Sequence, residues 1–106
     1  MKKSIDLYYW PTPNGWKVSI ALEEMKLPYN THPININKGE QFDENFLKIA
    51  PNNRVPAIKD HDGPENKIIT IFESGAILHY LALKTSSFIG NNNTDYHETM
   101  KWLMWQ

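Results

Sequence analysis

The sequence contains no cysteine. This absence excludes disulfides, thiolate metal sites and a redox-active thiol carried by the protein itself. The formal net charge is only −1 and the lysines and arginines are scattered, so charge gives no reason to expect a nucleic-acid partner. No apolar run approaches the roughly 20 residues that cross a membrane, so we expect no membrane partner either.

Several common catalytic and metal-binding signatures are also missing. The chain has no Gly-rich phosphate loop and no nucleophilic triad motif. Its four histidines lack the spacing of metal ligands, so no metal is predicted. What remains is a globular composition, 41% hydrophobic and 12% aromatic over 106 residues, which suits one domain that folds without disulfides or metals.

The first residues resemble the charged start of a signal peptide. Asp6 and Pro11 interrupt any apolar stretch behind Met1-Lys2-Lys3, so we interpret these three residues as the flank of a strand. We therefore expect a cytoplasmic protein.

Hydrophobic periodicity and turn residues predict the order βαβ, a connecting helix, then ββα. The predicted strands cover residues 4–9, 29–36, 55–60 and 67–72. The predicted helices are one capped by Asn14 and ended by Leu27-Pro28, one over residues 41–50, and one over residues 74–84. A helix between the first two strands makes them parallel, and a short loop makes the last two antiparallel. This is a thioredoxin-like α/β fold, a mixed four-stranded sheet with helices on both faces.

The sequence changes character beyond Lys84. Residues 86–93 are rich in serine, glycine and asparagine and read as a linker between a domain over residues 1–85 and a last segment over residues 94–106. Thr94 or Asp95 is expected to cap a final helix that has apolar residues on more than one face, as in a larger helical partner.

Two motifs suggest a binding site. Pro56 has no N–H, so the strand start at Val55 leaves backbone groups free to pair with something other than the sheet. Ser74 stands at a helix start, where its hydroxyl either caps the helix or binds an anion beside unpaired N–H groups. Extended-peptide recognition next to carboxylate recognition suits a small acidic peptide, for which glutathione is the candidate.

Five segments carry a family resemblance, over about residues 5–85. They are Thr12–Val18, Leu22–Glu24, Lys38–Phe42, Asn52–Ile58 and Phe72–Ile77. Together they resemble the N-terminal, glutathione-binding domain of the cytosolic glutathione transferases. Thr-Pro-Asn-Gly with Lys-Gly-Glu-Gln-Phe is most similar to the bacterial nu-class enzymes, which are glutathione-dependent disulfide-bond oxidoreductases. Residues 94–106 resemble the opening of the first helix of the family's all-helical C-terminal domain, so we expect a truncated form.

The resemblance implies how glutathione is held. Glu73 and Ser74 would take the ammonium and the carboxylate of the γ-glutamyl end. Val55 would pair with the cysteinyl amide beside a cis Pro56. Gln41 would contact the glycyl end or a partner glutathione, and Arg54 would place positive charge near the glycyl carboxylate. The alternatives from the residues alone are a helix cap for Ser74 and a solvated side chain for Glu73. For Pro56 the alternative is an ordinary trans proline at a strand start. Gln41 would otherwise be a plain residue at a helix N-terminus, and Arg54 would face solvent.

Thr12 and Asn14 are the candidate catalytic residues, because the resemblance places them at the glutathione sulfur. Neither is a general base, but a hydroxyl and an amide N–H stabilise a thiolate or a bound disulfide. This favours thiol–disulfide exchange with the protein as the positioning element. The alternative for Asn14 is a helix cap alone.

Three functions follow as hypotheses. The first is a glutathione-dependent disulfide reductase or glutathione transferase acting on a disulfide or an electrophile. The second is a module that binds glutathione or a protein without catalysis. The third is a fragment with low activity for lack of a C-terminal domain. A homodimer or an aggregation-prone monomer is expected, because a truncated chain would expose an apolar face.

Overall fold

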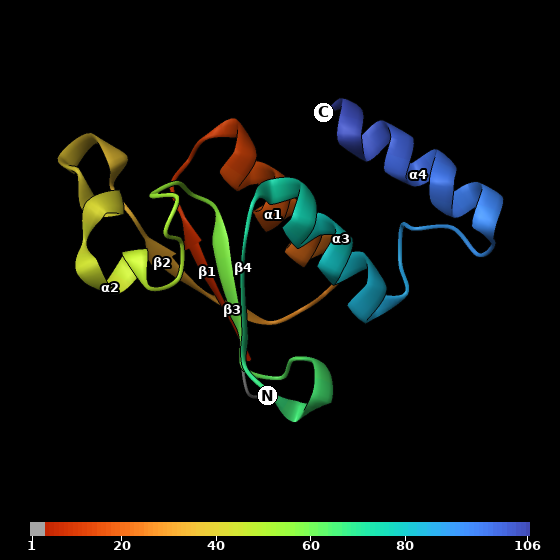
Figure 1. Ribbon diagram of the computed structural model, residues 1–106, viewed down its shortest axis with the longest axis horizontal. Coiled ribbons are helices and arrows are strands. Elements are labelled where there is room, and N and C mark those ends of the chain that lie inside the picture. The colour runs from red at the N-terminus through yellow and green to blue at the C-terminus, as the bar shows by residue number, and fades with distance from the viewer. Residues whose placement is uncertain (1–3) are drawn as a thin grey trace.

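A computed structural model describes residues 4–106, so the predicted role of Met1–Lys3 lies outside it. A mixed sheet stands between helices on both of its faces, which confirms the predicted thioredoxin-like fold (Figure 1). The elements in chain order are β1 (Ile5–Tyr9), α1 (Pro13–Glu24), β2 (Tyr29–Pro33), α2 (Glu44–Leu47), β3 (Ala57–Asp60), β4 (Ile69–Phe72), α3 (Ser74–Thr85) and α4 (Asn93–Trp105). Three 3₁₀ turns cover Ile36–Lys38, Glu40–Phe42 and Pro64–Asn66.

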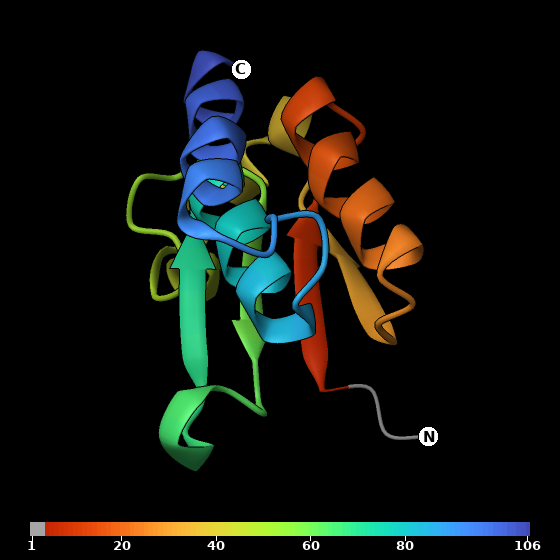
Figure 2. The same cartoon turned by 90° about the vertical axis from the view of Figure 1, so that its right-hand side faces the viewer.

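The four strands lie in the order β2-β1-β3-β4. The helical crossover makes β1 and β2 parallel, with Ile5 opposite Tyr29. The β3–β4 pair is antiparallel, as the short loop after β3 predicts, and the structure shows that the β1–β3 pair is antiparallel as well. In Figure 2 the sheet is seen from the side that α1 and α3 cover.

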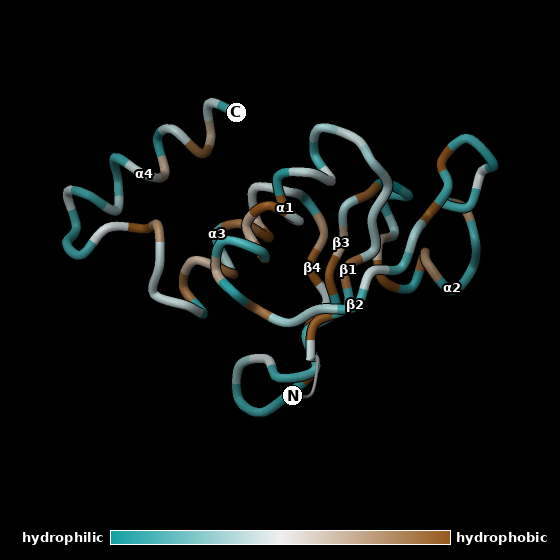
Figure 3. Tube along the Cα trace, turned by 180° about the vertical axis from the view of Figure 1, so that it is seen from behind, coloured by the Kyte–Doolittle hydropathy of each residue, from teal (hydrophilic) through white to brown (hydrophobic). Residues whose placement is uncertain are grey.

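The main core lies between the sheet and helices α1 and α3. Strand alternation and the helical stripes direct its buried side chains inward, and they are Ile5, Leu7, Val18, Leu22, Ile58, Ile77 and Leu81. A smaller cluster of Phe46, Ala50 and Ala57 covers the opposite face. Figure 3 shows hydrophobic residues along the strands and inner helices, and hydrophilic ones in the turn between β3 and β4.

A polar cluster links β1, β2 and the residue that follows β3. Asp6 lies with one carboxylate oxygen 3.0 Å from His32 Nε2 and the other 2.8 Å from His61 Nε2. Burial alone would raise the pKa of Asp6, but the hydrogen bonds from His61, His32 and Asn30 hold it below its ordinary value. His32 and His61, to which the sequence assigned no role, therefore have a structural one.

The predicted cap of the first helix is wrong. Thr12, not Asn14, is the N-cap of α1, and its hydroxyl accepts the Gly15 N–H at 3.2 Å. Pro13 follows as the first helical residue, where its fixed φ suits the helix and its missing N–H costs nothing. Asn14 is inside the first turn, so its side chain is not used for capping.

Local turns also shorten several predicted elements. The helix expected over residues 41–50 is a 3₁₀ turn and the four-residue α2, because Asp43 between them is extended, with φ −60° and ψ 137°. The strand after Tyr29 ends at Pro33, since Asn35 caps the next 3₁₀ turn. Strand β3 starts at Ala57 rather than residue 55, after the proline that cannot donate to the ladder.

The starts of β4 and α4 also differ from the predicted positions. Lys67 donates its N–H to Pro64 in the preceding turn, so β4 begins only at Ile69. Helix α4 begins at Asn93 and is capped by Asn92, whose side chain accepts the Asp95 N–H at 2.9 Å. The predicted caps Thr94 and Asp95 both lie inside this helix.

Candidate functional site

A small polar cleft opens where three segments meet at the upper end of the sheet in Figure 1. The segments are the start of α1, the loop before β3 and the start of α3. The cleft has a volume of about 110 Å³. Its lining residues are Asn14, Asn52, Arg54, Val55, Pro56, Glu73 and Ser74.

Six of the eight residues that the sequence singled out line this cleft. Thr12 does not, since it is occupied as the helix cap one residue before Pro13. Gln41 does not line it either and lies in the 3₁₀ turn Glu40–Phe42. Within residues 4–106 the Gln41 side-chain oxygen is buried without a hydrogen-bond partner.

The loop before β3 presents backbone to the cleft. The Val55–Pro56 peptide bond is cis, as expected from the resemblance. Because β3 starts at Ala57, Val55 lies outside the strand ladder, and it lines the cleft. Its N–H and C=O are thus not committed to the paired sheet.

Glu73 and Ser74 lie at the start of α3, where the sequence predicted a helix to begin, but the capping alternative for Ser74 is wrong. Glu73 is the N-cap residue of α3, with φ 76° and ψ 117°, and its side chain makes no capping hydrogen bond. Ser74 is the first helical residue, so it is not the cap. Positive φ is unfavourable for a residue with a Cβ and is tolerated where the surroundings hold it.

Asn52 is the cleft residue to which the sequence assigned no role. Its Nδ2 donates to Glu73 Oε2 at 3.4 Å, which links the loop before β3 to the start of α3. Its Oδ1 is buried and has no partner within the described range of 4–106. The motif Asn52–Ile58 contained the signal, but only the contact with Glu73 gives Asn52 its place.

Comparison with known proteins decides the family. Residues 3–83 match the family described as "Glutathione S-transferase, N-terminal domain". The chain belongs to the glutathione S-transferase family. The resemblance on which the sequence analysis rests is therefore confirmed.

The relatives of this transferase-family chain include two bacterial oxidoreductases. Disulfide-bond oxidoreductase YfcG of Escherichia coli K12 is 49% identical over 105 residues, which are 96% of this chain and 48% of that protein. Disulfide-bond oxidoreductase YghU of the same strain is 41% identical over 110 residues, 98% of this chain and 38% of that protein. The chain thus spans less than half the length of these relatives.

Solved structures of the family agree with the fold. A glutathione transferase family member from Pseudomonas fluorescens pf-5, with two glutathione molecules bound, has a TM-score of 0.94 and 46% identity. The match covers 97% of this chain and 45% of that one. Glutathione transferase YghU from Streptococcus pneumoniae, complexed with glutathione, has a TM-score of 0.91 and 38% identity, with coverage of 99% and 42%.

The transferase-type cleft has donors for anions and one acceptor for a cation. The first turn of α3 carries N–H groups without helical acceptors, and the Ser74 hydroxyl stands beside them. Arg54 adds a guanidinium, Asn14 adds an amide, and Glu73 is the one carboxylate in the lining. This combination suits a zwitterionic ligand with an additional anionic end.

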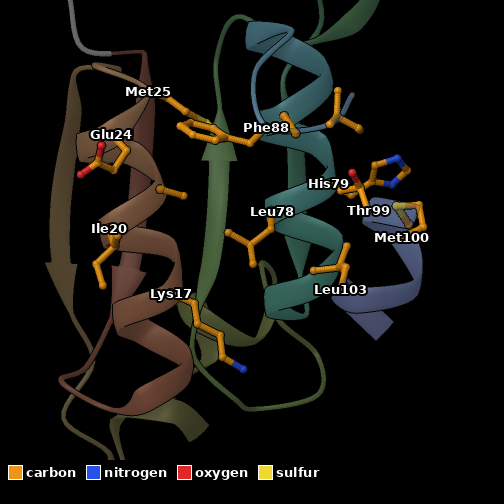
Figure 4. Close-up of a pocket in the computed structure, with 13 residues that line it drawn as sticks. Lys17, Ile20, Glu24, Met25, Leu78, His79, Phe88, Thr99, Met100 and Leu103 are labelled. Carbon is orange, nitrogen blue, oxygen red and sulfur yellow. The ribbon is translucent and has the colours of Figure 1, made fainter. Parts of the chain in front are cut away.

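Three further features of the described part of the chain concern metal binding, membrane crossing and a second groove. Residues 4–106 contain no group of three histidine, aspartate or glutamate side chains placed to hold a metal ion. None of the helices found there has the length and apolarity to cross a bilayer. A larger apolar groove of about 310 Å³ lies between α1, α3 and α4, and none of the predicted site residues line it (Figure 4).

Proposed function

We propose that this chain binds glutathione in the polar cleft and supplies the glutathione-binding half of a disulfide-bond oxidoreductase. One observation carries the proposal: Asn14, the Val55–Pro56 backbone and the Glu73–Ser74 pair come from three separate segments and surround one cleft. The glutathione bound to the related structures supports the ligand, and the names of the E. coli relatives support the reaction.

The γ-glutamyl end would lie at the start of α3. Its carboxylate would accept hydrogen bonds from Ser74 and the first N–H groups of the helix, where the helix dipole is positive. Its ammonium would pair with the Glu73 carboxylate, which Asn52 holds from the other wall. This end of the ligand makes the largest number of charged contacts.

The rest of the tripeptide would extend along the loop before β3. The cysteinyl amide would pair with the backbone of Val55, next to the cis peptide bond. Arg54, which is exposed on the rim, would attract the glycyl carboxylate. Gln41 lies outside the cleft, so it would contact only the glycyl end of the ligand or a second glutathione molecule.

The sulfur would lie at the start of α1, near Asn14 and Thr12. A glutathione thiolate attacks one sulfur of the substrate disulfide, so a mixed disulfide forms and one substrate half leaves as a thiolate. A second glutathione thiolate attacks the glutathione sulfur of the mixed disulfide and releases the other half. Two protons pass from the two glutathione thiols to the substrate thiols. The substrate gains two electrons and glutathione disulfide is formed.

A second candidate function is glutathione binding without turnover. The observation that favours it is the lining of the cleft, in which Asn14, the residue proposed to meet the sulfur, is neither a thiol nor a general base.

Calorimetric titration with reduced and with oxidised glutathione tests the binding proposal. The expected result is binding that Ser74→Ala weakens at least about tenfold, since charged-group hydrogen bonds contribute about 1.5–3 kcal/mol. Ser19→Ala is the matched control, because the Ser19 hydroxyl donates to the Trp16 carbonyl and does not line the cleft. No binding by the folded protein would overturn the proposal.

Turnover separates the two candidate functions. Reduction of bis(2-hydroxyethyl) disulfide by glutathione is followed through NADPH consumption by added glutathione reductase. Turnover above the uncatalysed rate supports the oxidoreductase, whereas binding without turnover supports the binding module.

We also propose a domain organisation, an oligomeric state and a cellular location for this chain. We place the glutathione-binding domain at residues 1–85, a linker at 86–93 and the start of a second, helical unit at 94–106. We further propose a homodimer, supported by the exposed Trp102, Met104 and Trp105 of α4. A cytoplasmic location fits the reaction, because glutathione sets the thiol–disulfide balance there.

A further inference from the structure

Lys17 lies one helical turn after Asn14 on α1, and the sequence assigned it no role. Its ammonium Nζ donates to Asn14 Oδ1 at 3.0 Å and also to the side-chain oxygen of Gln106 from the end of α4. Figure 4 shows the Lys17 side chain extending along the apolar groove, with its nitrogen at the end away from Phe88. The partly buried stem limits where the ammonium can go.

The hydrogen bond from Lys17 decides which way the Asn14 amide points. An ammonium has three donors and no acceptor, so only the carbonyl end of an amide can face it. The NH₂ end of Asn14 is therefore turned away from Lys17. Because Thr12 caps the helix, the Asn14 side chain is also not held by a capping bond. Its two N–H donors remain for a ligand in the cleft that Asn14 lines.

The ammonium also adds charge where an anion would form. The charged groups in the cleft wall are Arg54 and Glu73, of opposite sign. Along the groove, Glu24 of α1 and His79 of α3 are the other titratable groups, and His79 is hydrogen-bonded to Tyr96 of α4 at 3.0 Å. Lys17 is thus the cation in direct contact with the residue proposed to meet the sulfur.

We propose that Lys17 is a positioning residue for thiolate formation: it turns the Asn14 N–H donors toward the glutathione sulfur and adds positive charge beside it. This inference rests on the proposed glutathione site. It predicts that Lys17 affects the ionisation of bound glutathione more than its binding.

The experiment titrates the thiol of bound glutathione by its thiolate ultraviolet absorbance as pH is raised. An unperturbed thiol has a pKa of about 8.5, and the wild-type complex is expected below that value. Lys17→Met should raise the pKa of the bound thiol by about one unit, as expected for loss of a nearby opposite charge. Lys17→Arg should restore most of the difference, because it keeps the charge and the donors.

A second ligand and a control variant separate positioning from structure. S-methylglutathione has no ionisable thiol, so its affinity should stay within about twofold of wild type in Lys17→Met, as for a removed long-range charge. Lys48→Met removes a lysine that does not line the cleft and should change neither measurement. In an Asn14→Ala background, Lys17→Met should raise the thiol pKa less, because the two residues act together.

Two different failures are distinguishable. If neither glutathione nor S-methylglutathione binds wild type, the proposed function fails. If both bind and Lys17→Met leaves the thiol pKa unchanged, the Lys17 inference fails while the glutathione site stands. Equal loss of S-methylglutathione binding in Lys17→Met and Lys17→Arg would also overturn it, since Lys17 would then be structural.

Discussion

At the scale of single residues, close backbone approach explains one glycine of the Thr-Pro-Asn-Gly segment. A Cβ built on Gly15 would lie 2.4 Å from the Trp10 carbonyl oxygen and 3.0 Å from the Tyr9 ring. The Trp10 carbonyl is itself fixed, because it accepts the Thr12 N–H at 2.7 Å. The turn from β1 into α1 therefore has no space for a side chain at this position.

Gly15→Ala is expected to lower the free energy of unfolding by about 1–3 kcal/mol, because backbone atoms must shift to admit the methyl group. Gly75→Ala is the matched control, since its Cβ would meet only the flexible end of Gln106 at 3.1 Å. It should change the free energy by less than about 1 kcal/mol. Urea denaturation checks both, and equal costs would contradict the close-approach explanation.

Asn52 offers a second prediction at this scale, through its hydrogen bond to Glu73. Asn52→Ala should weaken glutathione binding about tenfold, because the Glu73 carboxylate loses the group that holds it toward the cleft. Calorimetry measures the change, and Asn45→Ala is the control, because Asn45 does not line this cleft. Unchanged affinity in Asn52→Ala would show that Glu73 needs no such support.

At the scale of elements, helix α1 depends on its cap. Thr12→Ala should destabilise the protein by about 1 kcal/mol, because the Gly15 N–H loses its acceptor. Asn14→Ala should cost less than about 0.5 kcal/mol, since it removes only an exposed contact with Lys17. Chemical denaturation of both variants distinguishes them, and the reverse order would restore the cap that the sequence predicted.

A buried carboxylate joins β3 to α3. Asp60 is fully buried, accepts from the Tyr80 hydroxyl at 2.6 Å, and lies 3.0 Å from Lys84 Nζ. Burial alone would raise the pKa of Asp60, but Tyr80, the Asp62 N–H and Lys84 hold it below its ordinary value. The same contact and burial raise the pKa of Tyr80.

The lowered pKa fixes the sign of the pH dependence. A carboxylate with a lower pKa in the folded state stabilises the fold above its unfolded pKa of about 3.9, and that stability is lost as pH falls through the folded value. Asp60→Asn should cost about 3 kcal/mol at neutral pH and progressively less in acid. Urea denaturation at neutral and acid pH checks this, with the exposed Asp62→Asn as control.

At the scale of the whole molecule, helix α4 exposes several large apolar side chains. None of its residues is buried, and the exposed fractions of Trp102, Met104 and Trp105 are 58%, 70% and 78%. Apolar surface of this kind favours association. Light scattering after size exclusion should therefore give about twice the 12.4 kDa chain mass, and Trp102→Ser with Trp105→Ser should shift it toward the single-chain value. A wild type that stays at 12.4 kDa over all concentrations would contradict the homodimer.

The sequence by itself determined the order of strands and helices along the chain, the parallel β1–β2 and antiparallel β3–β4 pairs, the cis Pro56 expected from the resemblance, and the family. These depend on short-range periodicity and on contiguous motifs, which a linear reading detects. Only the structure decided the sheet order β2-β1-β3-β4, the role of Thr12 as the cap of α1, and the hydrogen bonds from Asn52 to Glu73 and from Lys17 to Asn14. Which donor meets which acceptor depends on distances of a few ångströms, which the order of residues does not give. Asn52 and Glu73, for example, are distant in the sequence and are brought together only by folding.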